Sequence, residues 1–180
     1  MKQKSKQFEL NHIDGKFYLT EDYNGTTIKY KKGDRADYTS NSGYCKIKYN
    51  GNSVCVHRLI YQILFGEIPV GYEVDHINEI RNDNSLSNLR LVSKIENEWH
   101  RCLKGINIFN DKNGKPDTYH VKFTSIPNPE LFPEFNKLSN CYRKGKLSLH
   151  EAEMLVFKVK NYIKEYLDKI PTFQQLLDNQ

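Results

Sequence analysis

The stretch that most constrains the fold of this chain runs from residue 72 to residue 103. Residues 72–76 are predicted to form a strand, and the loop that follows is too rich in Asn, Asp and Ser for regular structure. Residues 89–92 are predicted as a second short strand. Residues 93–96, Ser-Lys-Ile-Glu, form a capping box from which a helix should extend to about Leu103. The sequence therefore predicts strand, loop, strand and helix in direct succession.

Turn-forming dipeptides predict β-structure before this stretch, up to about residue 56. Asp14-Gly15 and Asn50-Gly51 each separate two predicted strands. Both dipeptides tolerate the positive φ of a tight turn, so each is predicted to close a β-hairpin. In the second hairpin Lys46 and Lys48 form a cationic face, which is either simply solvated or contacts the phosphate backbone of a nucleic acid.

The end of the chain combines another predicted hairpin with a longer helix. Residues 106–110 and 118–124 are predicted strands on either side of Asn113-Gly114. A capping box at residues 148–151 begins a helix with apolar residues at helical spacing, and Pro171 should end it. That apolar stripe is predicted to be a packing face.

The pattern divides the chain into three segments. They are a β-rich N-terminal arm at residues 1–55, a central segment at 56–104 and a C-terminal three-strand-and-helix module at 105–180. A length of 180 residues allows one ordinary domain or two or three small modules. A hydrophobic fraction of 38% with 12% aromatic residues favours small modules with modest cores. The predicted fold class is α+β.

The net charge of +5 is spread unevenly. Residues 1–60 hold 11 Lys and Arg against 6 Asp and Glu, residues 61–105 hold 5 against 7, and residues 106–180 hold 11 against 9. Basic flanks around a slightly acidic centre suit a protein that contacts phosphates at both ends and holds a cation between them, although a merely soluble basic protein has the same balance. No apolar run has membrane-spanning length, and the four cysteines form no CxxC pair, so we expect a cytosolic protein without a zinc knuckle.

Four polar residues in the central segment have the types and spacing of a hydrolytic site. Packing the predicted helix on the two strands would bring Asp75 and Asn97 together as oxygen ligands of an open Mg²⁺ or Mn²⁺ site. Neighbouring strand residues point to opposite faces, so His76 is predicted to address a water molecule instead of the same ion. A neutral imidazole can accept a proton at cellular pH. Asn88 would then hold the loop that orients His76.

The motifs around these residues resemble those of a known family. Residues 56–101 are similar to the HNH, or ββα-metal, nucleases and, within them, to the phage homing endonucleases. The shared motifs are Val-His-Arg-Leu at 56–59, Asp-His-Ile at 75–77, Asn-Leu-Arg at 88–90 and Glu-Asn at 96–97. The family often continues its second motif with Asp-Gly-Asn, where this chain has Asn-Glu-Ile at 78–80.

This resemblance implies hydrolysis of double-stranded DNA with one divalent metal ion. It implies Asp75 and Asn97 as metal ligands, His76 as the general base and Asn88 as a structural residue of the catalytic loop. Residues 105–167 are similar to the small DNA-binding module of plant ethylene-response factors, although that module usually carries more arginine. The family also suggests a phage-infected or bacterial cell as the setting.

Four further residues are secondary candidates for the site. His57 either contacts phosphate or, as we favour, has a structural role by capping or packing its helix. His100 lies three residues beyond Asn97 on the same predicted helix face, within reach of an ion or a phosphate. Arg90 and Arg101 are predicted to meet a phosphate or a carboxylate.

The predicted function is therefore that of a metal-dependent DNA endonuclease, with a homing-type nicking enzyme as its finer form. A non-catalytic DNA-binding protein on the same scaffold is the main alternative, and a nuclease acting on RNA is a third. The sequence leaves open the target site, a monomer or a homodimer, and a nick or a double-strand cut.

Overall fold

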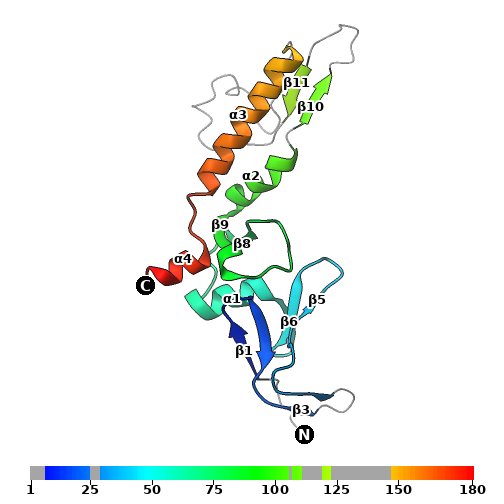
Figure 1. Ribbon diagram of the computed structural model, residues 1–180, viewed down its shortest axis with the longest axis vertical. Coiled ribbons are helices and arrows are strands. Elements are labelled where there is room, and N and C mark those ends of the chain that lie inside the picture. The colour runs from blue at the N-terminus through cyan, green and yellow to red at the C-terminus, as the bar shows by residue number, and fades with distance from the viewer. Residues whose placement is uncertain (1–6, 25–28, 106, 111–118, 123–146) are drawn as a thin grey trace. The chain divides into compact units, whose positions relative to one another are not determined.

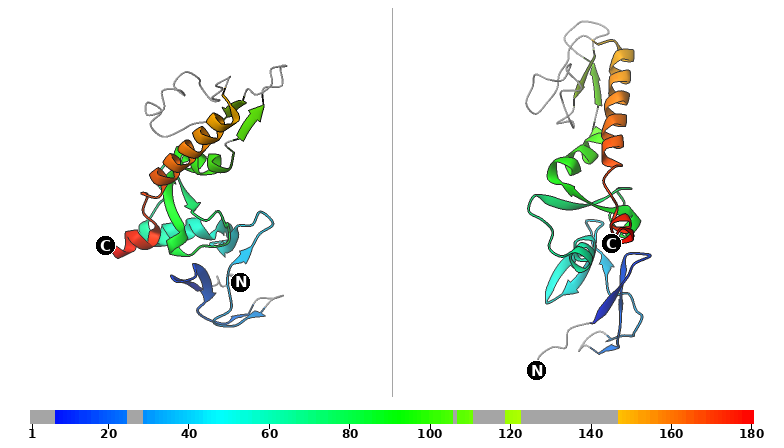
Figure 2. Two further views of the ribbon diagram at one scale, coloured as in Figure 1. Left: turned by 45° about the horizontal axis from the view of Figure 1, so that its top comes forward. Right: turned by 90° about the vertical axis from the view of Figure 1, so that its left-hand side faces the viewer.

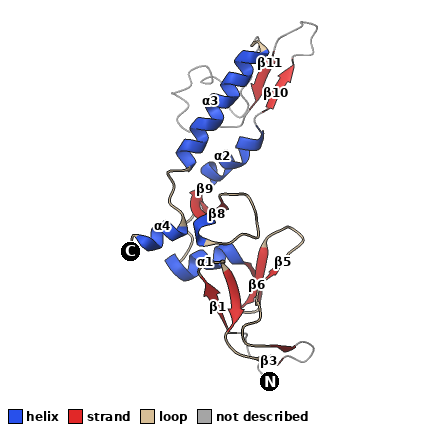
Figure 3. Ribbon diagram, in the orientation of Figure 1, coloured by secondary structure: helices blue, strands red, loops and turns tan. Residues whose placement is uncertain are grey.

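The computed structural model describes residues 7–24, 29–105, 107–110, 119–122 and 147–180 (Figure 1). The chain forms two compact units, one made of Met1–Val92 with Pro171–Gln180 and the other of Ser93–Ile170. Both units contain helices and strands, so the protein has mixed α/β structure (Figure 3). None of the helices among the described residues is long and apolar enough to cross a membrane.

The first unit begins with strands that form antiparallel pairs. Strands β1 (Phe8–Asn11) and β2 (Lys16–Leu19) are a hairpin, as Asp14-Gly15 predicts, and Gly15 has the positive φ of 63° that this turn requires. Two very short strands, β3 (Tyr23–Asn24) and β4 (Lys29–Tyr30), pair next along the chain.

A three-stranded antiparallel sheet follows, in the order β5 (Tyr38–Thr39), β6 (Cys45–Tyr49), β7 (Asn52–Cys55). The turn between β6 and β7 has positive φ at both central residues, 47° at Asn50 and 80° at Gly51. The hairpin predicted from Asn50-Gly51 is thereby confirmed, with the backbone twist of a tight two-residue turn.

Helix α1 (Val56–Phe65) ends at Gly66 and contacts β6 and β7 (Figure 2). Strands β8 (Tyr72–His76) and β9 (Leu89–Ser93) form a two-stranded sheet, with the short 3₁₀ helix η1 (Leu86–Asn88) between them. Helix α2 (Lys94–Gly105) follows β9 directly. The predicted succession of strand, loop, strand and helix is present in the chain.

One hydrophobic core holds the first unit together. Its buried residues come from β2, β6, α1, β8, η1 and β9, and from helix α4 (Phe173–Asp178): Phe17, Cys45, Ile47, Val56, Leu59, Ile60, Tyr61, Val74, Leu86, Leu89 and Phe173. The predicted arm at 1–55 and the part of the predicted central segment up to Val92 therefore share a core, while the rest of that segment lies in the second unit.

The second unit contains α2, strands β10 (Asn107–Asn110) and β11 (Tyr119–Lys122), and helix α3 (Leu149–Leu167). The two strands pair antiparallel as predicted, whereas the Asn113-Gly114 turn lies outside the described residues. Helix α3 contacts both strands and α2 (Figure 1). Its buried residues (Ala152, Val159, Ile163, Leu167) belong to the predicted apolar stripe.

Side-chain caps set where several helices begin. Ser93 and Glu96 bond each other's backbone N–H groups at the start of α2, and Ser148 and Glu151 do the same at α3. Helix α3 ends at Leu167, before Pro171, so the prediction that the proline ends it is wrong by four residues. The chain turns there and starts α4, which a third capping box at Thr172 and Gln175 begins.

Candidate active site

The candidate site is built at the end of β8, where the chain leaves the sheet. The backbone N–H of Ile77 donates to the carbonyl of Asn88 (2.9 Å). The Asn88 side chain accepts from the N–H of Asn78 (2.9 Å) and donates to the Asn78 side chain (2.9 Å) and to the carbonyl of Asp83 (2.8 Å). Asn88 thus holds both ends of the loop that begins at His76.

The part of this loop that departs from the family motif contains a residue in an unusual conformation. Glu79 has φ of 62°, in the left-handed region that is favourable for glycine and costs other residues on the order of 1 kcal/mol. Glycine is the residue that the family motif often has at this position. The loop therefore keeps a glycine-like backbone at a position where this chain has Glu.

His76 is buried and has a defined orientation. Its side chain is 5% exposed, and its Nε2 lies 3.1 Å from Oδ1 of Asn84, which is itself 1% exposed. An amide oxygen only accepts, so this contact is a hydrogen bond in the tautomer that carries its proton on Nε2, and in that tautomer Nδ1 is the nitrogen that can accept a proton.

Two aromatic rings pack beside the imidazole of His76. The ring of His57 meets it edge to face with centroids 5.0 Å apart, and Tyr44 lies 6.0 Å from His76 and 5.3 Å from His57. The guanidinium of Arg81 lies over the Tyr44 ring at 4.9 Å. These contacts restrict rotation of the imidazole in addition to its hydrogen bond.

Burial determines the charge of both histidines. Burial lowers the pKa of His76 below its ordinary value of 6.5, against the opposing effects of the Asn84 hydrogen bond and the nearby carboxylates Asp75 and Asp83. The pKa of His57 is lowered to about 3, first by burial and then by the proximity of His76. Both imidazoles are therefore neutral near pH 7, which is the form in which His76 can accept a proton.

His57 packs instead of capping its helix. It lies in the first turn of α1, where Cys55 is the N-cap and no side chain makes a capping hydrogen bond. The ring is 7% exposed, and its Nδ1 has no hydrogen-bond partner within the part of the chain that the structure describes. A neutral imidazole tolerates this environment better than a charged one.

Asp75 forms a buried ion pair. Its Oδ2 accepts from Nε of Arg90 at 3.0 Å and lies 2.9 Å from a terminal nitrogen of that guanidinium, and the two residues are 8% and 2% exposed. Of the two partners predicted for Arg90, a phosphate or a carboxylate, the structure gives the carboxylate. Arg90 fixes the orientation of Asp75, as partners of ligating carboxylates commonly do.

Three other predicted residues lie in the second unit. Asn97 and His100 are on α2, with His100 buried. Arg101 is exposed and forms an ion pair with Glu98, three residues before it. The meeting of Asp75 with Asn97 at one ion stays a prediction.

The donor set limits the kind of metal site that can form. Among the residues that the structure describes, no three His, Cys, Asp or Glu side chains gather in a way that could hold a metal ion. A closed zinc-type site is not built there. One carboxylate and one amide oxygen fit an open Mg²⁺ or Mn²⁺ site, which water and a phosphate oxygen would complete.

The predicted phosphate-contacting lysines lie on β6. Lys46 is half-buried and Lys48 is exposed, while Cys45 and Ile47, which alternate with them, are buried in the core. Over residues 45–48 the strand thus has the predicted cationic face on one side and an apolar face on the other. Tyr49, two residues beyond Ile47, is 42% exposed, although its ring packs on Phe8.

Sequence reasoning missed Asn84 and Tyr44 as neighbours of His76. Asn84 lies in a run of turn-forming residues, where one Asn is locally like the next. Tyr44 comes from a different hairpin and reaches the histidines only through tertiary packing. No local signal in the sequence separates either residue from its neighbours.

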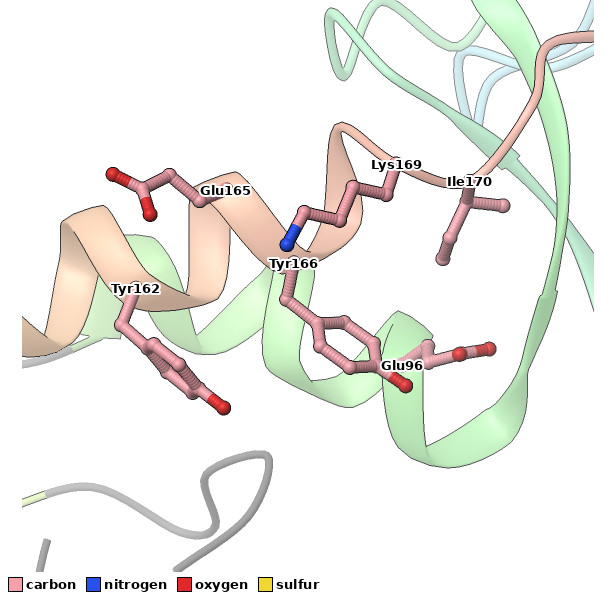
Figure 4. Close-up of a pocket in the computed structure, with 6 residues that line it drawn as sticks. All are labelled: Glu96, Tyr162, Glu165, Tyr166, Lys169 and Ile170. Atoms are coloured by element: carbon pink, nitrogen blue, oxygen red, sulfur yellow. The ribbon is translucent and has the colours of Figure 1, made fainter. Parts of the chain in front are cut away.

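A pocket of about 410 Å³ also occurs in the second unit, away from β8 in the sequence (Figure 4). Figure 4 shows Tyr166 pointing from α3 toward Glu96 of α2. Glu96 is engaged in the cap of α2. The pocket is lined by Glu96, Tyr162, Glu165, Tyr166, Lys169 and Ile170, and none of these residues belongs to the predicted site.

The central segment is similar to a known family of proteins. Residues 54–99 match the sequence model of a family described as HNH endonuclease. This range contains His57, Asp75, His76, Asn88 and Asn97. The resemblance to HNH endonucleases that the motifs predict is confirmed over this part of the chain.

Two relatives make the resemblance more particular. A protein of Acanthamoeba polyphaga mimivirus, named as an uncharacterised HNH endonuclease, is 32% identical over 104 residues, which cover 52% of this chain and 54% of that protein. A protein from the SPbeta prophage of Bacillus subtilis strain 168, provisionally named as an HNH homing endonuclease, is 28% identical over 131 residues, or 71% of this chain and 73% of that protein. The match thus spans about half the length of the mimivirus relative. No solved structure gives a significant match to this chain.

Proposed function

We propose that this protein is a metal-dependent endonuclease that hydrolyses phosphodiester bonds in double-stranded DNA, with His76 as the general base. The observation that carries the proposal is the state of His76, a neutral and buried imidazole held in one orientation inside the segment that matches HNH endonucleases. The name of the prophage relative supports the finer proposal of a homing-type enzyme. One site per chain would nick one strand in each binding event.

His76 would take the proton of the attacking water at Nδ1, since Nε2 faces Asn84. The rings of Tyr44 and His57 keep the imidazole from turning away as the proton is transferred. Asn88 holds the loop on which this orientation depends. General-base catalysis of this kind is worth on the order of 10²–10⁴ in rate.

We assign Asp75 and Asn97 as the residues that hold a divalent ion, Mg²⁺ or Mn²⁺. When bound, the ion supplies stabilisation of the negative charge that develops on the phosphate group during attack. Arg90 keeps the Asp75 carboxylate in a fixed orientation through Oδ2. His100 on the same helix as Asn97 is a secondary candidate for a phosphate contact.

The test is cleavage of supercoiled plasmid with Mg²⁺, Mn²⁺ or EDTA, with structured RNA as a parallel substrate. Nicking of the plasmid that EDTA abolishes, with intact RNA, is the expected result. Cleavage of RNA but not of the plasmid would show that RNA is the substrate. Tight DNA binding without cleavage in either metal would favour the non-catalytic alternative.

His76→Ala separates chemistry from binding. Cleavage should fall by about 10²–10⁴, while DNA affinity measured by fluorescence anisotropy in EDTA should stay at the parental value, because phosphate contacts elsewhere dominate it. Near-parental cleavage, or an equal loss of binding and cleavage, would contradict the assignment of the base.

The pH dependence of the parent gives a second measurement of the same group. Only neutral His76 accepts a proton, so cleavage should rise with pH on the acid side. The pKa of His76 is lowered, so that this rise should lie below the ordinary imidazole range. It should be missing from whatever activity His76→Ala retains.

A further inference from the structure

We propose that Asn84 is a positioning residue that fixes His76 in the tautomer with the proton on Nε2. The proposal rests on the function proposed above and adds a residue that neither the motifs nor the family match singles out. It stands on three features of the structure: the contact of Asn84 with His76, the burial of both groups, and the packing of the β1–β2 turn against the Asn84 backbone.

The contact itself sets the tautomer. Oδ1 of Asn84 lies 3.1 Å from Nε2 of His76. An amide oxygen only accepts hydrogen bonds, so Nε2 must donate, and in a neutral imidazole the lone pair is then on Nδ1. The two side chains are 1% and 5% exposed, so water does not compete strongly for this bond. His76 therefore presents the same nitrogen to an incoming water molecule each time.

Asn84 is held in place by the first hairpin, a neighbour distant in sequence. A Cβ atom added to Gly15 would lie 1.7 Å from the carbonyl oxygen of Asn84 and 2.8 Å from the backbone nitrogen of Ser85. The turn between β1 and β2 thus packs directly against the Asn84 backbone, and its φ of 63° also favours glycine. Phe17, at the start of the same hairpin's second strand, is fully buried in the core.

These contacts give the N-terminal arm a role at the reaction site. The hairpin supports Asn84, Asn84 orients His76, and His76 acts on water. An imidazole that exchanges between tautomers presents the wrong nitrogen for part of the time, and displacement of a reacting group by about 1 Å can lower a rate on the order of 10²-fold. Loss of the Asn84 contact should therefore reduce turnover without weakening DNA binding.

The first measurement is independent of DNA cleavage. A ¹⁵N–¹H long-range NMR spectrum of the full-length protein labelled at histidine reports which ring nitrogen carries the proton, and the His76 signals are identified by their absence in His76→Gln. The parent should show protonated Nε2 and unprotonated Nδ1. Asn84→Ala should show a mixture of both tautomers, whereas Asn84→Asp, which keeps an acceptor oxygen, should restore the parental pattern. A parent with the proton on Nδ1, or an unchanged tautomer in Asn84→Ala, would overturn the proposal.

The second measurement is cleavage kinetics on plasmid DNA with Mg²⁺. Asn84→Ala should lower kcat by about 10- to 100-fold with little change in KM. Asn84→Asp has the same shape and keeps an acceptor oxygen, and at a pH above the His76 pKa, which the added carboxylate raises, it should keep kcat within several-fold of the parent. Asn82→Ala is the matched control, since this neighbour in the same loop is exposed, and it should leave both constants unchanged.

Two kinetic outcomes would reject the positioning role. One is an equal loss of kcat in the Asn82 and Asn84 variants, which would indicate only a general effect on the loop. The other is a rise in KM that accounts for the whole effect. If the parent fails to cleave DNA with any metal, the proposed function fails, and the NMR spectrum still decides whether Asn84 sets the tautomer.

Discussion

The candidate base shows how a single side chain acquires chemical properties from its surroundings. A free imidazole is partly charged near pH 6.5 and carries its proton on either nitrogen. In this protein burial favours the neutral form of His76, and the Asn84 contact selects one tautomer of that form. Burial also lowers the pKa of the neighbouring His57 ring, so acid should reduce the free energy of unfolding, which can be measured.

The first prediction concerns His57 and pH. Its folded-state pKa of about 3 lies below the unfolded value of 6.5, so the unfolded chain binds the proton first. This part of the stability is complete above pH 6.5 and is lost as the pH falls toward 3. At about pH 4.5 the parent should have lost about 2–3 kcal/mol from this group.

Urea unfolding of the parent and of His57→Phe at pH 7 and at about pH 4.5 measures the effect. The Phe variant should lose less stability on acidification, since it has no proton to bind. It retains the other acid-sensitive groups, including Asp14 and Asp83, whose pKa values are lowered in the fold. Equal losses in the two proteins would mean that His57 is already charged, or is solvated, in the native state.

The second prediction concerns the buried pair of Asp75 and Arg90. Arg90→Met removes the guanidinium that pairs with the buried Asp75 carboxylate, which should reduce the free energy of unfolding by about 3–5 kcal/mol. Arg58→Met is the matched control, because Arg58 is exposed on α1, and it should change stability by less than about 0.5 kcal/mol.

Both proteins should be unfolded with urea in EDTA, so that metal binding does not contribute. Matching midpoints for parent and Arg90→Met would show that the pair is solvated. The same pair affects how the metal ligand is tested. Asp75→Ala would remove the ion pair with Arg90 and leave a cavity as well, so Asp75→Asn, with its fold checked by circular dichroism, is the better variant for measuring loss of metal affinity.

At the scale of secondary-structure elements, α4 depends on one aromatic residue. Phe173 is fully buried, and its ring lies 5.4 Å from both Tyr61 and Phe65 of α1. Phe173→Ala should lower the free energy of unfolding by about 3–5 kcal/mol, because a buried ring is replaced by a cavity. Phe157→Ala on α3 is the control, since Phe157 is 62% exposed, and it should have little effect.

The measurement is thermal and urea unfolding of both variants. Equal stability of the two would mean that α4 is not part of the first unit's core. The result also guides truncation, because a fragment that ends before Pro171 loses Phe173. A fragment without residues 1–40 would likewise lose Phe17 from the same core.

At the scale of the whole molecule, the uneven charge predicts how DNA binding depends on salt. If Lys46 and Lys48 each contact one phosphate, Lys46→Ala/Lys48→Ala should reduce the slope of log affinity against log salt by about 2. Lys160→Ala/Lys164→Ala on α3 removes the same charge from the second unit and should leave the slope closer to that of the parent. Fluorescence anisotropy titrations across several salt concentrations measure it.

Equal slopes for the two double variants would show that net charge acts only through its total, and the face of β6 would lose its assignment as a DNA contact. A slope unchanged in the β6 variant alone would mean that Lys46 and Lys48 are solvated. That second outcome would agree with the alternative interpretation of the strand, in which its cationic face is simply solvated.

Local sequence signals were enough to predict the elements around the site. Asp14-Gly15 and Asn50-Gly51 specified hairpins because few residue types tolerate the positive φ that Gly15, Asn50 and Gly51 adopt. Ser-x-x-Glu specified helix starts because its side chains satisfy free N–H groups within one turn. The four motifs between residues 56 and 97, taken together, predicted the resemblance to HNH endonucleases that the family model matches over residues 54–99.

Which distant residues meet depends on the folding of the whole chain. The pairing of Asp75 with Arg90, the ring of Tyr44 beside His76, the return of Phe173 to the first core and the packing of Gly15 on Asn84 join residues that are well separated in sequence or locally indistinguishable from their neighbours. Such contacts are selected by how apolar surface is buried and how buried polar groups find partners, which depends on the whole fold. Local patterns therefore identified His76 as a candidate base, whereas its tautomer and charge follow from side chains that only the fold brings to it.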